Sequence, residues 1–180
     1  MPSFLELCSG TAVMSKRMKE LGWNTTTVDI DPSFNSDIVG DIRTMVDKFS
    51  PGEYDVVFCS PPCDEFTKYV LPWHELKKPS MDIAIACARI IRAINPKLWF
   101  IENVNGARKF FKPVFGDVTF AFGLSWFIWG SYIGVRSVPV SVAGRNKINT
   151  SGKVKRASYH PMMVEKLCAG IDRRYRELVV

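Results

Sequence analysis

The chain has 180 residues, of which 47% are hydrophobic, and this length and composition predict one domain with a substantial core. Five cysteines, an odd number at irregular spacing, favour free thiols in a reducing, cytosol-like compartment and argue against a disulfide framework. The net charge of +6 is concentrated in residues 136–180, which hold ten basic and three acidic side chains. Such a basic segment indicates either a polyanionic partner or an ordinary solvated surface.

Two features could point to a membrane or metal protein. Residues 118–135 carry no charge, but glycines and hydroxyl residues interrupt them, so we expect two buried strands joined by a glycine turn. Cys59 and Cys63 lie close together with His74 nearby, but no second pair of ligands follows. We therefore expect neither a membrane-spanning segment nor a metal site.

The N-terminal residues predict a strand over 4–7, a turn of small residues, a helix over 12–21 and a second strand that ends at Asp29. Backbone N–H groups at such a turn can face a ligand, and a carboxylate after the second strand can bind both hydroxyls of a ribose. Because Gly10 is the turn's only glycine, the turn suits a nucleoside without a pyrophosphate. This pattern favours S-adenosylmethionine over a dinucleotide.

A third short strand, over 38–42, closes on Asp41, whose carboxylate either accepts a hydrogen bond from an adenine amino group or serves as an ordinary turn residue. A fourth strand over 54–57 is followed by Pro61, Pro62 and Cys63. In an open α/β sheet, ligands bind just beyond the carboxyl ends of the strands. Cys63 is therefore a candidate nucleophile, although most free cysteines behave as small buried hydrophobes.

Residues 64–78 are polar and aromatic without clear periodicity, which predicts a mobile active-site loop. Residues 81–94 predict an amphipathic helix, and a fifth strand over 97–101 leads into Glu102. Neighbouring strands lie about 4.8 Å apart. If the fourth and fifth strands are parallel neighbours, Cys63 and Glu102 could contact one small ring; otherwise Glu102 serves as a structural carboxylate.

The remaining residues complete one α/β domain. They predict a short helix over 107–112, the two apolar strands, an edge strand over 137–142, a basic loop over 144–155 and a final helix over 161–168. We expect a Rossmann-like fold whose mostly parallel, doubly wound sheet carries an antiparallel edge strand. Residues 1–144 would form the core, and residues 145–180 a candidate nucleic-acid contact region.

Five motifs, within residues 3–144, resemble those of the DNA cytosine-C5 methyltransferase family. They are Phe4-Leu5-Glu6-Leu7-Cys8-Ser9-Gly10-Thr11, Asp29-Ile30-Asp31, Gly40-Asp41-Ile42, Pro61-Pro62-Cys63 with Phe66-Thr67, and Glu102-Asn103-Val104. The Pro-Pro-Cys and Glu-Asn-Val motifs, in this order and about forty residues apart, are specific to the family. The resemblance implies a class I methyltransferase domain that transfers a methyl group from S-adenosylmethionine to cytosine C5 in DNA.

The resemblance also implies a role for each matching residue. The implied cofactor-binding residues are Leu7, Cys8, Ser9, Gly10, Thr11, Asp29, Ile30, Asp41 and Ile42. Cys63 would attack C6 of the cytosine as a thiolate, which makes C5 nucleophilic enough to accept the methyl group. Glu102 would hold or donate a proton at the base N3. Arg136, a loose match to an arginine-rich strand motif, completes the implied catalytic set.

Three features depart from the family pattern. The arginine-rich motif is reduced to Arg136, and the glycine-asparagine-serine signature of the last helix is not evident. Only about twenty residues separate Arg136 from Arg156, where the family inserts a long base-reading segment. The chain therefore resembles small phage-type members, which would act in the host cytoplasm, and a partner or a dimer could supply target recognition. A methyltransferase acting on RNA and a catalytically idle DNA-binding relative stay open as alternatives.

Overall fold

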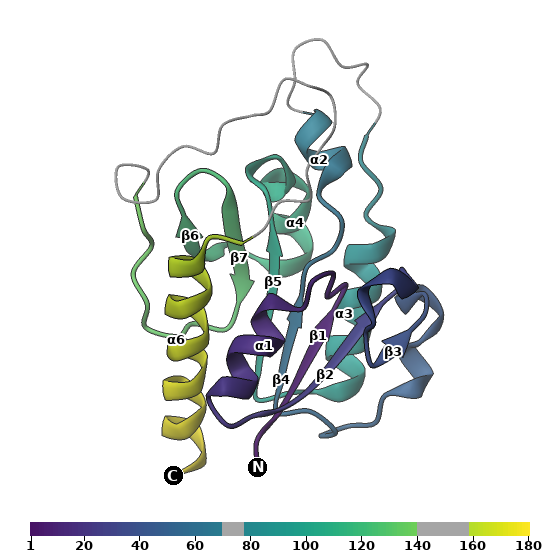
Figure 1. Ribbon diagram of the computed structural model, residues 1–180. Coiled ribbons are helices and arrows are strands. Elements are labelled where there is room, and N and C mark those ends of the chain that lie inside the picture. Colours follow the sequence, from purple (N-terminus) through teal and green to yellow (C-terminus); the bar gives the residue numbers. More distant parts are fainter. Residues whose placement is uncertain (70–77, 140–158) are drawn as a thin grey trace.

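The computed structural model describes residues 1–69, 78–139 and 159–180, which form a seven-stranded sheet between two layers of helices (Figure 1). The strand order is β3-β2-β1-β4-β5-β7-β6. The strands are β1 (Ser3–Leu7), β2 (Asn24–Asp29), β3 (Ile38–Val39), β4 (Val56–Cys59), β5 (Leu98–Asn103), β6 (Val118–Phe122) and β7 (Trp126–Gly130). The pairings among β1 to β5 are all parallel, whereas β7 is antiparallel to both β5 and β6. The expected Rossmann-like, mostly parallel sheet is confirmed, with its antiparallel pairings at the β6 edge.

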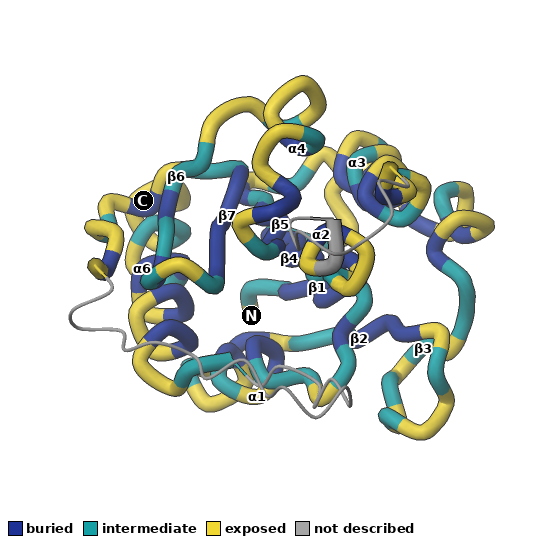
Figure 2. The backbone as a smooth tube through the Cα atoms, turned by 90° about the horizontal axis from the view of Figure 1, so that it is seen from above, coloured by how far each residue is buried: buried dark blue, intermediate teal, exposed yellow. Residues whose placement is uncertain are grey.

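The helices cover both faces of this sheet (Figure 2). The α-helices are α1 (Val13–Glu20), α2 (Asp64–Tyr69), α3 (Asp82–Ile94), α4 (Arg108–Phe115) and α6 (Pro161–Val179), and the short 3-10 helices are η1 (Pro32–Phe34), η2 (Ile42–Thr44), η3 (Val46–Lys48) and η4 (Asn105–Ala107). Helices α1 and α6 pack against one face and α3 and α4 against the other. The chain is therefore doubly wound, as its alternating strand and helix pattern predicts.

Two hydrophobic cores follow from the alternation of side chains along each strand. Phe4 and Phe58 belong to the core beneath α1 and α6, whereas Leu5 and Cys59 belong to the core beneath α3 and α4. All four side chains of β4 are buried, which is why this strand is a continuous apolar run. The sheet is thus held from both sides, and its strand ends are fixed in space.

Residues 64–69, expected as the start of a loop, form helix α2 instead. The phenyl ring of Phe66 is buried against the rings of Phe110 and Phe111, at centroid distances of 5.8 and 5.4 Å. The sequence pattern of six residues is too short to show this packing, which depends on α4. The rest of the expected loop, residues 70–77, lies outside the described residues.

The last helix continues to Val179, where the sequence had predicted an end at Cys168. Gly170 lies inside the helix and brings it close to Ile133 and Val135. A Cβ atom added at Gly170 would lie 2.8 Å from Ile133 Cδ1 and 2.5 Å from Val135 Cγ2. Gly170 is therefore a close-packing position inside the helix.

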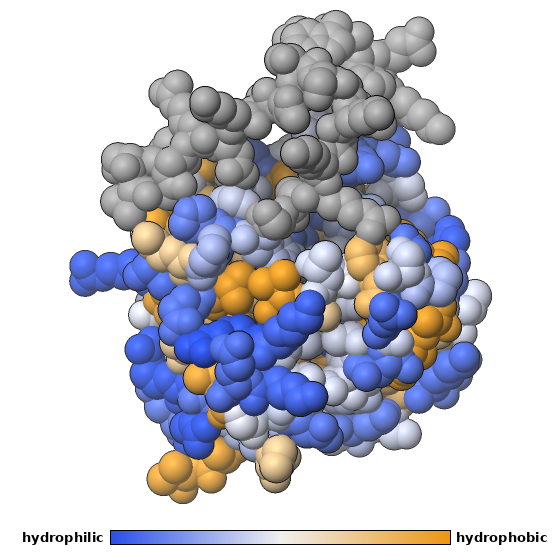
Figure 3. Space-filling view, in the orientation of Figure 1, coloured by the Kyte–Doolittle hydropathy of each residue, from blue (hydrophilic) through white to orange (hydrophobic). Residues whose placement is uncertain are grey.

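The apolar segment 118–135 holds the hairpin of β6 and β7, as expected. Within the described part of the expected edge strand over 137–142, only Val138 pairs, in a single bridge to Phe122 of β6. No helix in the described parts of the chain has the length and hydrophobicity needed to cross a membrane. Hydrophilic side chains cover most of the visible surface of α1 and α6 (Figure 3).

Candidate active site

The turn between β1 and α1 has an unusual backbone. Cys8, Gly10 and Ala12 all have positive φ angles, of 55°, 50° and 54°. Only Gly10 adopts such an angle without a steric penalty, so the turn is a strained loop that the surrounding contacts must hold. It replaces the glycine-rich turn of dinucleotide-binding sheets. Thr11 is exposed at the outer side of this turn.

The side chains at the start of the turn point into the protein. Leu7 is fully buried at the end of β1. The Cys8 thiol hydrogen-bonds to Cys87 of α3, and this contact is the main reason why the pKa of Cys8 is raised. The hydroxyl of Ser9 lies 3.0 Å from that of Ser36. The backbone N–H of Ser9 is also engaged, by the carbonyl of Val28, so both the backbone and the side chains of these residues fix the turn.

Asp29 at the end of β2 is bound to this turn. One of its carboxylate oxygens accepts the Gly10 N–H at 2.8 Å, and the other accepts the Asp31 N–H at 3.0 Å. Each carboxylate oxygen can accept a second hydrogen bond, so both can still bind a ribose hydroxyl. Ile30, the next residue, is 62% exposed and offers an apolar surface beside the carboxylate. The arrangement fits a nucleoside.

Asp41 lies at the start of η2 and is paired with Arg43. The two residues make a bidentate ion pair with a shortest distance of 2.5 Å, and the guanidinium lowers the pKa of the carboxyl. Ile42 is buried beneath this turn. An adenine amino group would therefore share the Asp41 oxygens with Arg43. The implied role of Asp41 stays a prediction.

Cys63 follows β4, after Pro61 and Pro62, and is partly exposed at the start of α2. The backbone N–H and the hydroxyl of Thr67 both donate to its carbonyl oxygen, at 2.9 and 3.0 Å. Burial, and then the negative charges of Glu102 and Asp64, raise the pKa of the Cys63 thiol to about 11. In the free protein this cysteine is therefore a thiol at neutral pH.

Glu102 lies on β5, next to β4 in the sheet. The register pairs Cys59 with Ile101, so Ser60 and Glu102 follow at adjacent positions. The Tyr159 hydroxyl donates to Glu102 Oε2 at 3.0 Å, and burial raises the pKa of Glu102 to about 7. The expected parallel neighbourhood of the fourth and fifth strands is confirmed. Cys63 and Glu102 emerge at adjacent strand ends, as that neighbourhood predicts.

Asn103, which the sequence analysis placed in the Glu-Asn-Val motif without a role, joins the end of β5 to the loop that carries Cys63. It is fully buried, and its amide donates to the carbonyl of Pro61 at 2.9 Å. Its own side-chain oxygen accepts the Val104 N–H at 2.9 Å. The asparagine that follows the glutamate at the strand end was the signal that could have revealed this link.

Tyr159 was also missed, because it precedes α6 in a basic stretch without a motif. Arg136, in contrast, is exposed and makes no hydrogen bond or ion pair within the described residues. The structure therefore does not bring Arg136 into contact with Cys63 or Glu102. Nor do the described ranges contain a group of three or more His, Cys, Asp or Glu side chains that could hold a metal ion.

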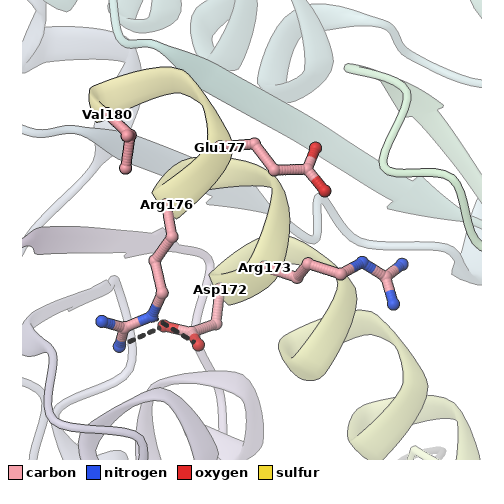
Figure 4. Close-up of a pocket in the computed structure, with 5 residues that line it drawn as sticks. All are labelled: Asp172, Arg173, Arg176, Glu177 and Val180. Atoms are coloured by element: carbon pink, nitrogen blue, oxygen red, sulfur yellow. Dashed lines mark hydrogen bonds and ion pairs between the residues drawn. The ribbon is translucent and has the colours of Figure 1, made fainter.

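One further hollow, of about 630 Å³, lies beside the last turns of α6 (Figure 4). Its polar side chains are already paired: Asp172 accepts hydrogen bonds from Arg176 and from the indole of Trp23. The C-terminal end of α6 lies beside the amino ends of the parallel strands, opposite the carboxyl ends of β4 and β5 (Figure 1). This hollow is separate from the candidate site.

The Rossmann-like sheet, with the turn after β1 and the acid after β2, defines a class I methyltransferase fold. The model of the C-5 cytosine-specific DNA methylase family matches residues 4–117, and the chain belongs to that family. Methylases of this family use S-adenosylmethionine, the cofactor that the sequence predicted.

A viral protein and two solved structures resemble the chain at low sequence identity. The chain is 29% identical over 118 residues to a probable DNA (cytosine-5)-methyltransferase of Frog virus 3 (isolate Goorha), a match that covers 58% of this chain and 54% of the viral protein. The chain thus spans about half the length of this relative. A putative DNA modification methyltransferase encoded within an E. coli prophage is 17% identical, with a TM-score of 0.48 and coverage of 73% of this chain and 47% of that one. The S. pombe Dnmt2 methyltransferase is also 17% identical, with a TM-score of 0.45 and coverage of 87% of this chain and 57% of that one.

Proposed function

We propose that this chain transfers a methyl group from S-adenosylmethionine to C5 of cytosine in DNA, through a covalent bond between Cys63 and C6 of the base. The observation that carries the proposal is the pairing of β4 with β5, which sets Cys63 and Glu102 at adjacent strand ends. The hydrogen bond from Asn103 to the Pro61 carbonyl holds the end of β5 against the loop that carries Cys63. Membership of the DNA methylase family supports the reaction class and DNA as the substrate.

In the first step, Cys63 gives up its thiol proton to solvent and its sulfur forms a bond to C6. The electron pair of the C5–C6 double bond shifts to C4–C5, and the pair of the C4–N3 double bond moves to N3. Glu102 delivers a proton to N3, and its pKa of about 7 suits a group that donates and recovers a proton near neutral pH. Bound S-adenosylmethionine would supply the methyl group from its sulfonium, and the activated C5 would be the nucleophile. Water then accepts the C5 proton, the electron pair of the C5–H bond re-forms the C5–C6 double bond and expels Cys63 as a thiolate, and the N3 proton returns to Glu102.

The protonation of Glu102 also assists Cys63. The carboxylate charge of Glu102 is one of the causes that raise the pKa of the thiol. Once Glu102 carries a proton, that repulsion disappears and the thiolate becomes easier to form. The free protein therefore holds an unreactive thiol, and the pair becomes active when the carboxyl is neutral and a base occupies the site.

The residues beside β1 and β2 fit the proposed cofactor. Asp29 has acceptor capacity left for the ribose hydroxyls, and exposed Ile30 provides an apolar contact for the adenine. The turn from Leu7 to Thr11 would border the remainder of the cofactor. Asp41 and Ile42 would border the adenine on its other side.

A DNA substrate is supported by the charges beside the site. Helix α4 begins shortly after Glu102 with two exposed cations, Arg108 and Lys109, which lie over the rings of Phe127 and Phe110 at 5.4 and 5.1 Å. Cations at such a rim suit the phosphates that flank a target base. In a duplex the target cytosine would have to leave the stack to reach Cys63. The other expected phosphate contacts, in residues 145–156, lie outside the described residues.

A trapping experiment tests the proposal. The protein is incubated with S-adenosylmethionine and DNA that contains 5-fluorocytosine, which blocks loss of the C5 substituent, and the adduct is located by mass spectrometry. We expect the adduct on Cys63, its loss in Cys63→Ser, and its retention in Cys59→Ala, because Cys59 is fully buried inside β4. Methylation of DNA without an adduct at Cys63 would contradict the covalent mechanism. Methylation of RNA alone would contradict the DNA substrate.

A further inference from the structure

Tyr159, just before α6, stands at the centre of a partly buried polar cluster beside the candidate site. Its hydroxyl donates to Glu102 Oε2 at 3.0 Å and is in hydrogen-bond contact with the Ser60 hydroxyl. Because a tyrosine hydroxyl has one proton, donation to Glu102 leaves it as the acceptor of the Ser60 proton. The three side chains therefore form a directed chain, Ser60 to Tyr159 to Glu102.

The position of Tyr159 is fixed by the start of α6. His160 caps this helix: its Nδ1 atom accepts the Met162 N–H at 3.2 Å. The His160 ring lies 5.0 Å from the ring of Phe122 and 6.4 Å from that of Trp126. These contacts hold the peptide of Tyr159 against the sheet, so its hydroxyl is placed by packing and not by a free loop.

Few other groups face this cluster. The Tyr159 hydroxyl is the donor to the Glu102 carboxyl, the Ser60 hydroxyl donates in turn to Tyr159, and the charge of Glu102 acts on Cys63. Glu6 of β1, also buried, acts on Tyr159 through its charge. Among the described residues, no lysine or arginine contacts the Glu102 carboxyl. Hydroxyl groups therefore carry out the orientation of Glu102.

We propose that Tyr159 is a positioning residue that fixes Glu102 Oε2 and thereby directs the carboxyl proton to Oε1, the oxygen free to meet the target base. The inference rests on the proposed function. When protonated, a carboxyl that accepts a hydrogen bond at one oxygen carries its own proton on the other. Without the Tyr159 hydroxyl, Glu102 loses both its fixed rotamer and the preference for a proton on Oε1. The segment that leads into α6 thus positions a catalytic side chain.

Tyr159→Phe tests the proposal, because it removes the hydroxyl and keeps the ring that packs against the core. Two quantities are measured: the pH profile of single-turnover DNA methylation, and the titration of Glu102 by carbon-13 NMR of labelled glutamate carboxyls, assigned with Glu102→Gln. We expect the Glu102 pKa to rise by about one unit, because a hydrogen bond that favours the ionised form is lost. On the acidic plateau, where Glu102 is protonated in both proteins, we expect the rate to fall by about tenfold through misplacement alone.

Tyr175→Phe is the matched control, since Tyr175 lies on α6, the helix that Tyr159 precedes, and its hydroxyl contacts Asp55, away from Glu102. It should change neither quantity, and Ser60→Ala should change both in the same direction as Tyr159→Phe but less. An unchanged Glu102 titration and an unchanged plateau rate in Tyr159→Phe would overturn the inference. If the wild-type protein methylates no DNA, the proposed function fails, and the NMR titration alone still decides whether Tyr159 controls the Glu102 carboxyl.

Discussion

Glu102 makes the stability of the fold depend on pH in a direction that can be worked out. Burial raises the pKa of this carboxyl from 4.5 to about 7, and each pKa unit corresponds to about 1.36 kcal/mol. The folded state therefore holds the proton more tightly than the unfolded state. The resulting stabilisation is fully present below pH 4.5 and is lost as the pH rises to about 7. Between these limits the ionisation of Glu102 costs the fold about 3 kcal/mol.

Glu102→Gln removes the titration and keeps the shape of the side chain. We expect the stability of the variant relative to the wild type to increase by about 3 kcal/mol between about pH 4.5 and pH 8. Urea unfolding, followed by circular dichroism at both pH values, measures this change. Comparing two pH values cancels any constant effect of the new amide on the hydrogen bond to Tyr159.

Glu177→Gln is the control, because Glu177 is an exposed partner of Arg174 and its removal should alter stability by no more than a few tenths of a kcal/mol. A Glu102→Gln effect that is the same at both pH values would refute the reasoning, because it would mean that the folded and unfolded states bind the Glu102 proton equally. The same variant should lose methyl transfer, since an amide cannot deliver a proton to N3. A gain in stability together with a loss of activity would show that the site holds a costly buried charge for its chemistry.

Three further predictions follow from single contacts. Asp29→Ala should weaken cofactor binding by about 1–3 kcal/mol, as measured by calorimetry, and a wild type that binds no S-adenosylmethionine would contradict the assignment. Asn103→Ala should destabilise the fold by about 1–3 kcal/mol in urea unfolding, because it leaves buried backbone groups unpaired; an unchanged midpoint would disprove the link. Gly130→Ala should cost about 3 kcal/mol, because φ is 117° and the new Cβ would lie 2.2 Å from the Trp99 carbonyl oxygen. Gly116→Ala, with positive φ but open space, should cost clearly less when both variants are compared by thermal unfolding. Equal losses of stability would contradict a clash at Gly130.

The sequence by itself determined the elements that depend on local periodicity. The amphipathic helix α3 and the hairpin of β6 and β7 lie where the residue pattern predicted them, and β4 begins and ends two residues after its predicted bounds. The two motifs after β4 and β5 also indicated which strand ends carry the chemistry. These features could be predicted because a helix or strand that faces one core must repeat its apolar residues at a fixed interval.

Charge was less informative than periodicity. The excess of cations after residue 136 suggested a surface for a polyanion, but the arginines of α6 are engaged within the fold. Arg173 donates to the Ile133 carbonyl, Arg174 pairs with Glu177 and Arg176 pairs with Asp172. A count of charges cannot distinguish an ion pair one turn away on a helix from a free cation, because both have the same composition.

Only the tertiary structure decided what surrounds Glu102. Tyr159 is 57 residues from Glu102 in the chain, and no motif marks it. The hydroxyl reaches the carboxyl because the start of α6 packs on the hairpin of β6 and β7, where the His160 ring contacts Phe122 and Trp126. The raised pKa values of Glu102 and Cys63 have the same origin, because burial depends on neighbours that are distant in sequence. Local pattern predicted which residues could react, and long-range packing set their protonation, orientation and partners.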